Sequence, residues 1–221
     1  MERLLANFYI TPSDLGLLLL GAELTIEVTI ISLLIASVIG LAVGLAKISR
    51  NSAIRGAASA YISIIRGLPL LVQILYVYFG IALTTGIRIP PFTAGVVTMS
   101  IYAGAYSAEI FRSGIESIDK GQMEGALSIG LSRWQAMFHV VLPQATRRMA
   151  PTFANLFSTT LKDTSLLSVI GVTELTMAGQ NIYAVNFQTL KVLTIVGGIY
   201  FAMVYALSKL TSLLQKKARN A

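Results

Sequence analysis

Residues 119–143 read DKGQMEGALSIGLSRWQAMFHVVLP, a polar, glycine-bearing segment within a strongly apolar chain. Residues 119–129 suit a short helix, and Gly130 suits its termination. Ser132 can cap a second helix, which is expected to stop before Pro143 because proline provides no backbone N–H for a helix interior. The segment therefore predicts two short helices that meet at an angle.

Several side chains of this segment suit contact with another protein. Gly125 and Ala126 are small enough to permit close approach, and Trp134 and Phe138 offer apolar anchors that a loop in water would not otherwise expose. We therefore expect a soluble partner to cover segment 119–143. The alternative is an amphipathic hairpin that rests on a membrane surface.

The rest of the chain has the composition of a membrane protein. Of its 221 residues, 55% are hydrophobic and 12% are charged. A helix crosses the hydrocarbon core with about 20 apolar residues, and several runs reach that length. We predict an all-α integral membrane protein with one transmembrane domain over residues 1–221, a long loop at 112–150, and five transmembrane helices at about 16–46, 57–83, 91–111, 151–170 and 191–214.

Charge placement predicts the orientation of these five spans. If the C-terminus is inside, most of the 17 basic residues lie on the inner side of the membrane: Lys47, Arg50, Arg55, Arg112, Lys120, Arg133, Arg147, Arg148, Lys209, Lys216, Lys217 and Arg219. The outer side then holds only Arg3, Arg88 and Lys191. The positive-inside bias therefore predicts an external N-terminus, a cytoplasmic C-terminus and a multi-pass protein of the cell membrane. The net charge of +7 needs no nucleic-acid partner to explain it.

Cysteine and histidine counts exclude other kinds of chemistry. The chain has no cysteine and one histidine, which excludes disulfides and thiolate catalysis and leaves no ligand set for a metal. The string Gly, four residues, Gly-Lys and Ser or Thr does not occur, so this chain has no P-loop for ATP. We therefore expect no bound cofactor and no enzymatic activity of its own.

The segment quoted above resembles the EAA motif of ABC importer permeases, which reads Glu-Ala-Ala, three residues, Gly, nine residues, Ile, any residue, Leu-Pro. The residues at these positions are Glu124, Gly125, Ala126, Gly130, Val140, Leu142 and Pro143. The spacing is complete, and the departures are Gly125 and Val140. Glycine in place of alanine weakens helix propensity by up to about 1 kcal/mol. Further stretches similar to the polar amino acid branch of that family are 21–25, 61–73, 105–112, 121–122 and 162–166.

This resemblance implies a type I importer architecture and a set of partners. It implies a second permease chain, as a homodimer or with a similar paralogue, a pair of cytoplasmic ABC ATPase subunits that bind ATP and Mg, and an extracytoplasmic amino-acid-binding protein. The residues that it implies in ATPase coupling are Gly121, Glu124, Gly125, Ala126, Gly130, Trp134, Leu142 and Pro143. The substrate that it implies is a polar amino acid such as histidine, arginine, glutamine or glutamate.

Arg66 is the first charge expected at membrane depth, where an unpartnered charge costs roughly 2.5 to 3.5 kcal/mol or more. It lies beside Gly67 and Pro69, which are expected to break the second span and expose polar backbone. Ser63 and Gln73 share its helical stripe, so this stripe suits a substrate carboxylate. The alternatives are that Arg66 reaches the cytoplasmic interface or has a structural partner.

Asp163 is expected near the middle of the fourth span and needs a partner other than Lys162, which points about 100° away around the helix. A substrate ammonium group is one candidate, with Thr164 adding a hydroxyl. A permanent pair with Arg66 or with the second permease chain is the other. Asp163 and Thr164 are therefore candidate substrate-binding residues.

Three more acids lie near the predicted path. Glu109 shares a helix face with Tyr102 and could receive a cationic side chain, or it could pair with Arg112 three residues later. Glu23 and Glu27 could form an acidic outer mouth, or they could simply lie at the outer interface. Residues 171–190 are too polar to cross and could form an external cap in which Glu174, Gln180 and Asn181 contact the binding protein or gate the path.

The surplus of acids over bases near the path favours arginine, lysine or histidine as substrate, and glutamine or glutamate is the alternative. A rival class of function is a passive channel or an ion-coupled carrier. Carriers often contain two related halves, and no such repeat is visible in this sequence. We therefore favour a permease subunit whose transport is driven by ATP hydrolysis in a partner.

Overall fold

The computed structural model describes residues 11–220, which are helical apart from short connections and contain no strand. Arg3 lies outside the described residues, and so do the side chains of Lys216, Lys217 and Arg219. The α-helices are α2 (Pro12–Lys47), α3 (Ser52–Gly67), α4 (Leu70–Leu75), α5 (Ile81–Thr85), α6 (Pro91–Glu116), α7 (Lys120–Ser128), α8 (Arg133–Ala136), α9 (Leu142–Asp163), α10 (Leu175–Asn186) and α11 (Thr189–Asn220). Two π-helical turns, η1 (Tyr76–Gly80) and η2 (Met137–Val141), and a 3-10 helix, η3 (Thr164–Ile170), connect some of them.

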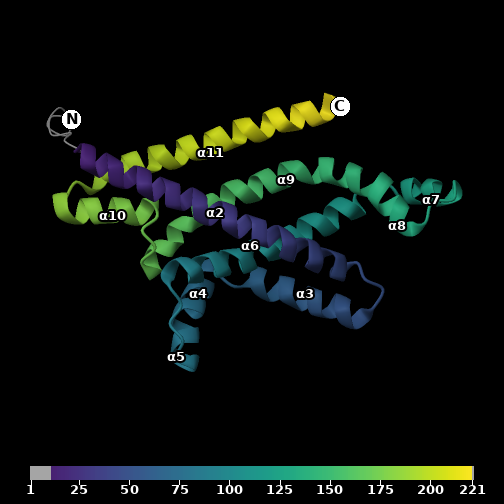
Figure 1. The fold of residues 1–221 in the computed structure, drawn as a ribbon, viewed down its shortest axis with the longest axis horizontal. Helices are drawn as coiled ribbons and strands as arrows, with labels where there is room; N and C mark the ends of the chain where they lie inside the picture. The colour runs from purple at the N-terminus through teal and green to yellow at the C-terminus, as the bar shows by residue number, and fades with distance from the viewer. Residues whose placement is uncertain (1–10, 221) are drawn as a thin grey trace.

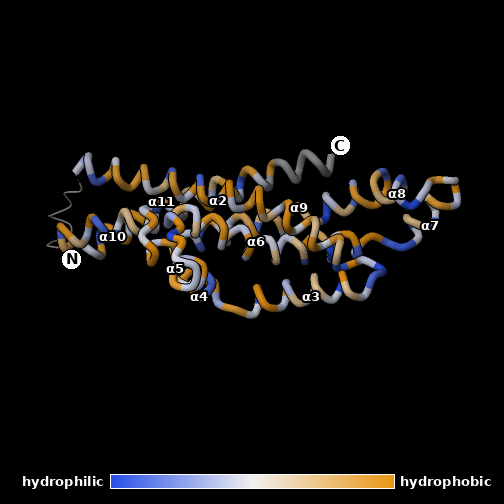
Figure 2. The backbone as a smooth tube through the Cα atoms, turned by 60° about the horizontal axis from the view of Figure 1, so that its bottom comes forward, coloured by the Kyte–Doolittle hydropathy of each residue, from blue (hydrophilic) through white to orange (hydrophobic). Residues whose placement is uncertain are grey.

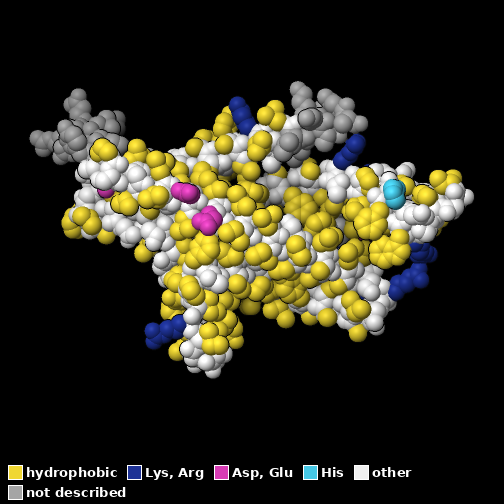
Figure 3. Space-filling model, viewed as in Figure 1, with side chains coloured by type: hydrophobic (Ala, Val, Ile, Leu, Met, Phe, Trp, Pro, Cys, Tyr) yellow, Lys and Arg dark blue, Asp and Glu magenta, His cyan; other side chains and the backbone are white. Residues whose placement is uncertain are grey.

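The long helices α2, α6, α9 and α11 run roughly along one axis, with α7 and α8 at one end of the bundle and α10 at the other (Figure 1). Hydrophilic residues gather near the end of the bundle that contains α7 and α8 (Figure 2). A broad band of hydrophobic side chains covers the middle of the face seen in Figure 3, with basic side chains mainly near its rim. This distribution suits a bundle whose middle faces lipid and whose ends face water.

The pair α2 and α6 forms the centre of the bundle and is its most extensive helix contact. A Cβ atom at Gly40 would lie 2.3 Å from the Cβ of Ser107, and a Cβ at Gly104 would lie 2.8 Å from the Cγ2 of Ile39. The two backbones therefore approach more closely than larger side chains would permit. The buried residues of α2 that recur every fourth position along this contact are Val28, Ser32, Ala36, Gly40 and Gly44.

Length and composition identify fewer spans than the five predicted. Among the described residues, α2 and the segment Thr189–Thr211 of α11 are long and apolar enough to cross a membrane, and a third span results if Ser52–Gly67 and Leu70–Thr85 count as one. Helix α6 packs against protein on much of its surface. Most of its thirteen buried residues are small or polar, and these residues lower its mean hydropathy. Helix α9 is polar at its start. The count of five spans and the orientation of the termini therefore stay predictions.

The break expected in the span at 57–83 is confirmed, and two other spans have different bounds. Helix α3 and the α4–α5 segment meet at an angle of 103°. Pro69 begins the second part as its N-cap, and Leu68 is extended with ψ of 140°, as expected for a residue before proline. The span at 91–111 runs on to Glu116, and the one at 151–170 consists of the end of α9 and the 3-10 helix η3. Residues 112–150, predicted as a loop, are mostly helical.

We expect Gly40→Ala to destabilise the protein by about 1 to 3 kcal/mol, because the added methyl group would force α2 away from α6. Gly16→Ala is a matched control in the same helix, since a Cβ there meets nothing within 4 Å. The control should leave stability unchanged or raise it by up to about 1 kcal/mol through helix propensity. Thermal unfolding of the purified protein in detergent measures both, and equal melting temperatures for the two variants would contradict the close approach at Gly40.

Candidate functional site

The α7–α8 segment folds as its cap residues predict. Asp119 accepts a hydrogen bond from the backbone N–H of Gly121 at 2.7 Å and begins α7. Gly130 ends it in the left-handed region with φ of 89°, a conformation that favours glycine. Ser132 caps α8 through a reciprocal pair of hydrogen bonds with Gln135. The predicted helix end at Gly130 and the predicted start of a second helix at Ser132 are therefore confirmed.

The outer surface of this segment is apolar. The exposed fractions are 79% for Ile129, 73% for Trp134 and 56% for Phe138, and the rings of Trp134 and Phe138 stack with their centroids 6.0 Å apart. Gly125 is exposed and a Cβ there would meet nothing within 4 Å. Ala126 is buried within the chain, with 5% exposure, so it offers little surface of its own to a partner.

The second helix does not stop before Pro143, and that prediction is wrong. Helix α8 continues through the π-helical turn η2 directly into α9, and Pro143 stands in the first turn of α9. A π-helical turn shifts the backbone hydrogen bonds by one residue, which accommodates the N–H that proline lacks. The exposed aromatic rings are therefore continuous, through one run of helix, with Asp163 at the other end of α9.

Two further contacts fix the α7–α8 segment, called the docking segment below, to the bundle. Gln144 of α9 donates to the side chain of Gln122 in α7 at 3.1 Å and to the carbonyl oxygen of Val140 at 2.9 Å. Arg148 donates to the carbonyl oxygen of Ser117, which follows α6. A cluster of buried side chains beneath them adds apolar contact between α6 and α9. The α7–α8 segment is thus held to both helices.

A polar cluster lies where α3, α6 and the end of α9 come together. The Cζ atom of Arg66 lies 4.9 Å from the ring centroid of Tyr106, which is a cation–π distance. The hydroxyl of Tyr102 donates to that of Tyr106 at 3.2 Å. Asp163 and Arg66 both lie within electrostatic range of Tyr102. Three residues predicted from sequence, Arg66, Tyr102 and Asp163, are therefore brought to one region.

Within residues 11–220, Asp163 and Arg66 form no ion pair with each other at 4 Å or less. Arg66 has an exposed side chain, and that of Asp163 is half-buried. Asp163 is the last residue of α9, not the middle of a span, and α-helix changes to 3-10 helix immediately after it. The two opposite charges are thus separate groups in the same region, which suits a ligand that carries both an ammonium and a carboxylate.

Other predicted substrate residues have partners elsewhere. The guanidinium of Arg112 binds the carboxylates of Glu109 and Glu116, with 3.1 Å from Arg112 Nε to Glu109 Oε1, so the structural alternative for Glu109 is the one observed. Thr164 is fully buried and donates to the carbonyl oxygen of Leu161 at 2.7 Å. Ser63 is exposed on α3. Glu109 lies within electrostatic range of Arg66, but its carboxylate is engaged by Arg112. Among residues 11–220, Thr164 and Ser63 form no hydrogen bond with Arg66, Tyr102, Tyr106 or Asp163.

Gln73 supports the break between α3 and α4. Its Nε2 donates to the carbonyl oxygens of Ile65 at 2.8 Å and of Leu68 at 3.0 Å. These carbonyls belong to the helix end that the break at Pro69 leaves without helical partners. The amide N–H groups of Gln73 therefore serve the backbone, and its predicted contact with substrate lacks a free donor.

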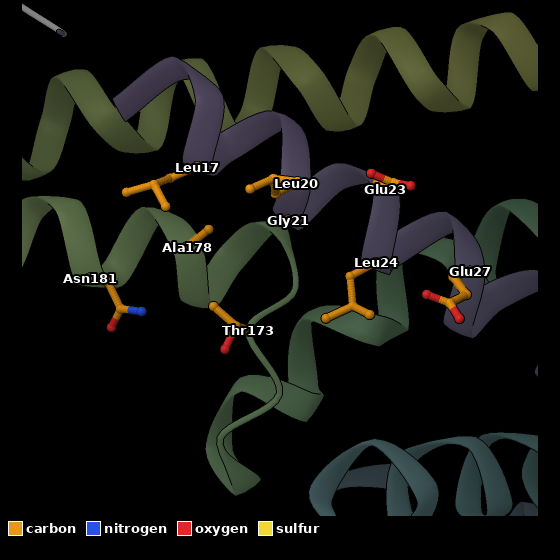
Figure 4. A pocket seen from close by; sticks show the side chains of 9 residues that line it. All are labelled: Leu17, Leu20, Gly21, Glu23, Leu24, Glu27, Thr173, Ala178 and Asn181. Carbon is orange, nitrogen blue, oxygen red and sulfur yellow. The ribbon is translucent and has the colours of Figure 1, made fainter. Parts of the chain in front are cut away.

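The end of the bundle that contains α10 has a groove of about 350 Å³ between α2 and α10 (Figure 4). Glu23 and Glu27 are exposed and line this groove together with Thr173 and Asn181. Figure 4 shows the two carboxylates on successive turns of α2, beside leucine side chains. The geometry is compatible with the predicted acidic mouth and with a simple position at a membrane interface.

The structure corrects the prediction for Glu174, which was expected to contact a binding protein. Its side chain is fully buried and caps the start of α10 by accepting from the backbone N–H groups of Thr176 and Met177, both at 2.9 Å. Burial raises the pKa of the Glu174 carboxyl, and these hydrogen bonds oppose the shift. Sequence reasoning also missed Tyr106, although its position four residues after Tyr102 on one helix face could have indicated it.

Apolar helices, a broken helix beside a charged side chain and an exposed aromatic docking segment together define a transport subunit of a membrane. Residues 36–218 match the family described as binding-protein-dependent transport system inner membrane component, and the chain belongs to this family of ABC importer permeases. It is a transport subunit and not an enzyme, since ATP hydrolysis in this class takes place in a separate subunit.

Individual relatives match nearly the whole chain. The glutamine transport system permease protein GlnP of Escherichia coli strain K12 is 41% identical over 204 residues, which is 92% of this chain and 93% of the relative. The arginine transport system permease protein ArtQ of Bacillus subtilis strain 168 is 32% identical over 214 residues, or 97% and 98% of the two chains. The crystal structure of an amino acid ABC transporter with histidines superposes with a TM-score of 0.87 at 39% identity, over 91% of this chain and 94% of that one.

We expect Gln73→Leu to destabilise the protein by about 1 to 3 kcal/mol, because the carbonyl oxygens of Ile65 and Leu68 would lose their donor. Tyr76→Phe is a control on the same segment, since that side chain is 74% exposed. Thermal unfolding in detergent compares the two variants. If Gln73→Leu kept normal stability but changed which amino acid is transported, Gln73 would be a substrate residue and the structural interpretation would fail.

Proposed function

We propose that this chain is the membrane-spanning subunit of an ATP-driven importer for polar amino acids, located in the cell membrane with its α7–α8 segment in the cytoplasm. The observation that carries the proposal is the unbroken helical run from the exposed rings of Trp134 and Phe138 to Asp163. One end of this run suits a protein partner and the other end suits a charged ligand. The similarity to permeases named for glutamine and arginine supports the same substrate class.

The polar cluster explains how an amino acid would be recognised. Asp163 would bind the α-ammonium group and Arg66 the α-carboxylate, while the ring of Tyr106 holds the guanidinium in place. Every α-amino acid carries both of these groups, so the cluster would recognise the class of substrate and not the individual member. Because neither charge forms an ion pair within 4 Å among residues 11–220, each is available to the ligand.

Two substrates stand as candidates. Basic amino acids fit the acids Glu23, Glu27 and Asp163, but Glu109 no longer supports them because its carboxylate is paired with Arg112, which also binds Glu116. Glutamine is favoured by the 41% identity to a glutamine permease. The proposed assembly contains two permease chains, each with five spans and an external N-terminus, a pair of ABC ATPase subunits and an external binding protein.

Energy enters at the docking segment. When two ATPase subunits close around nucleotide, a segment bound to each of them moves with it, and α9 carries this motion to the cluster. The ATPase can shift the equilibrium between outward-open and inward-open states only by the difference between its binding free energies for the two states. This chain contributes α9 as the rigid connection between the docking segment and the polar cluster. The charges of the cluster change position when α9 moves.

We expect Trp134→Ala combined with Phe138→Ala to release the ATPase, because anchors of this kind each contribute about 2 kcal/mol or more to an interface. Phe201→Ala is a matched control, since that ring is 72% exposed on α11, away from the docking segment. Copurification of coexpressed ATPase with the tagged permease in detergent measures the effect. Retention of the ATPase by the double variant, at the level of the control, would overturn the docking role.

We expect Asp163→Asn to lower amino acid uptake at least tenfold in liposomes that contain the complex and its binding protein, because the ammonium group loses a charge-assisted partner, with a value of about 1.5 to 3 kcal/mol. Lys162→Gln is the neighbouring control, because Lys162 is exposed. Competition between labelled arginine and labelled glutamine in the same liposomes decides between the two substrates. Unchanged uptake and selectivity in Asp163→Asn would remove Asp163 from the site.

A further inference from the structure

The buried carboxylate of Glu174 has a third partner beyond the two backbone N–H groups of α10. The hydroxyl of Tyr200, in α11, donates to Glu174 Oε2 at 2.7 Å. The same hydroxyl lies 3.1 Å from Oγ1 of Thr176. The carboxylate therefore joins the start of α10 to the middle of α11.

Capping alone does not require this arrangement. A serine or aspartate in solvent caps a helix equally well, whereas a fully buried carboxylate must recover its lost hydration from protein donors. The three donors around Glu174 come from two helices, so they are satisfied together only when α10 and α11 keep one relative position. Next to it, the backbone N–H of Leu175 donates to Oγ1 of Thr25 in α2 at 3.2 Å, which adds a third helix to the junction.

The junction reaches the polar cluster through helix packing. Helix α10 packs against η3 and α11 packs against α9, so the two helices that Glu174 joins contact the chain on both sides of Asp163. Thr164 is fully buried, begins η3 and directly follows Asp163. A 3-10 helix has weaker hydrogen-bond geometry than an α-helix, so the direction of Asp163 at this change of helix type depends on what holds η3 in place.

We propose that Glu174 and Tyr200 are positioning residues that hold α10 against α11, keep η3 in place and so fix the direction of the Asp163 carboxylate for substrate. This inference rests on the proposed function, in which Asp163 binds the ammonium group of an amino acid. It adds two residues that touch no substrate. Their effect passes through the packing of α10 on η3, and it connects the selectivity of the site to the external segment that contains α10.

The chain contains no cysteine, so a single introduced thiol reports the position of residue 163 without any transport assay. Asp163→Cys is made in the complete permease–ATPase complex, and its rate of labelling by a water-soluble thiol reagent is measured. Adding Tyr200→Phe, which removes only the hydroxyl, is expected to change that rate by about threefold or more, the factor that corresponds to one typical hydrogen bond. Glu174→Gln is expected to change it in the same direction.

Two controls separate positioning from general loosening of the fold. Tyr205→Phe, on the same helix with 51% exposure, should leave the labelling rate at 163 unchanged. Ser63→Cys, on exposed α3, should label at one rate with and without Tyr200→Phe. Unchanged labelling at 163 in both Tyr200→Phe and Glu174→Gln would overturn the inference, and so would equal changes at 63 and 163.

Transport measured with the natural Asp163 distinguishes this inference from the proposed function. Tyr200→Phe should lower uptake roughly three- to tenfold, and Tyr205→Phe should not lower it. If wild-type complex takes up amino acid while Tyr200→Phe is fully active, the inference fails and the proposed function stands. If wild-type complex takes up no amino acid with ATP and binding protein present, the proposed function fails, and the inference fails with it.

Discussion

The close contact between α2 and α6 is the constraint on which the rest of the bundle depends. Water-driven burial cannot hold helices together inside lipid, so shape and close approach must do so. Gly40 and Gly104 provide that approach, since a Cβ at either position would collide with the facing helix. With α6 fixed in this way, α3 and α9 pack against its remaining surface and bring Arg66 and Asp163 toward Tyr102.

The same constraint explains which features of the fold could be predicted from the sequence. Apolar runs locate α2 and α11 well, because those helices present much of their surface to lipid. Helix α6 is identified less clearly because protein surrounds it. Its small or polar residues allow close packing and lower its mean hydropathy. Local rules were sufficient for the helix end at Gly130, the cap at Ser132 and the break at Pro69, since each depends on residues a few positions apart. Pro143 misled the prediction because a π-helical turn accommodates it.

The candidate site shows the same division between local and distant contacts. The pair of Glu109 with Arg112 was foreseen as an alternative, because residues three apart on a helix are neighbours whatever the fold. The roles of Gln73 and Glu174 were not foreseen. Gln73 returns to carbonyls across a bend whose angle the sequence does not contain, and Tyr200 meets Glu174 only after α11 has packed beside α10. Tertiary packing decides such partners.

The continuous run from α8 through η2 to the end of α9 also transmits torsion. Twenty-two residues of α9 extend for about 33 Å, and rotation of such a rod at one end appears at the other without any change in length. A turn of about 20° would sweep a carboxylate that lies roughly 5 Å from the axis through about 2 Å. Pro151 removes one backbone hydrogen bond along the way, so bending concentrates there while twist passes through. The carboxylate could thus be aimed toward one side of the membrane or the other by rolling the helix in place.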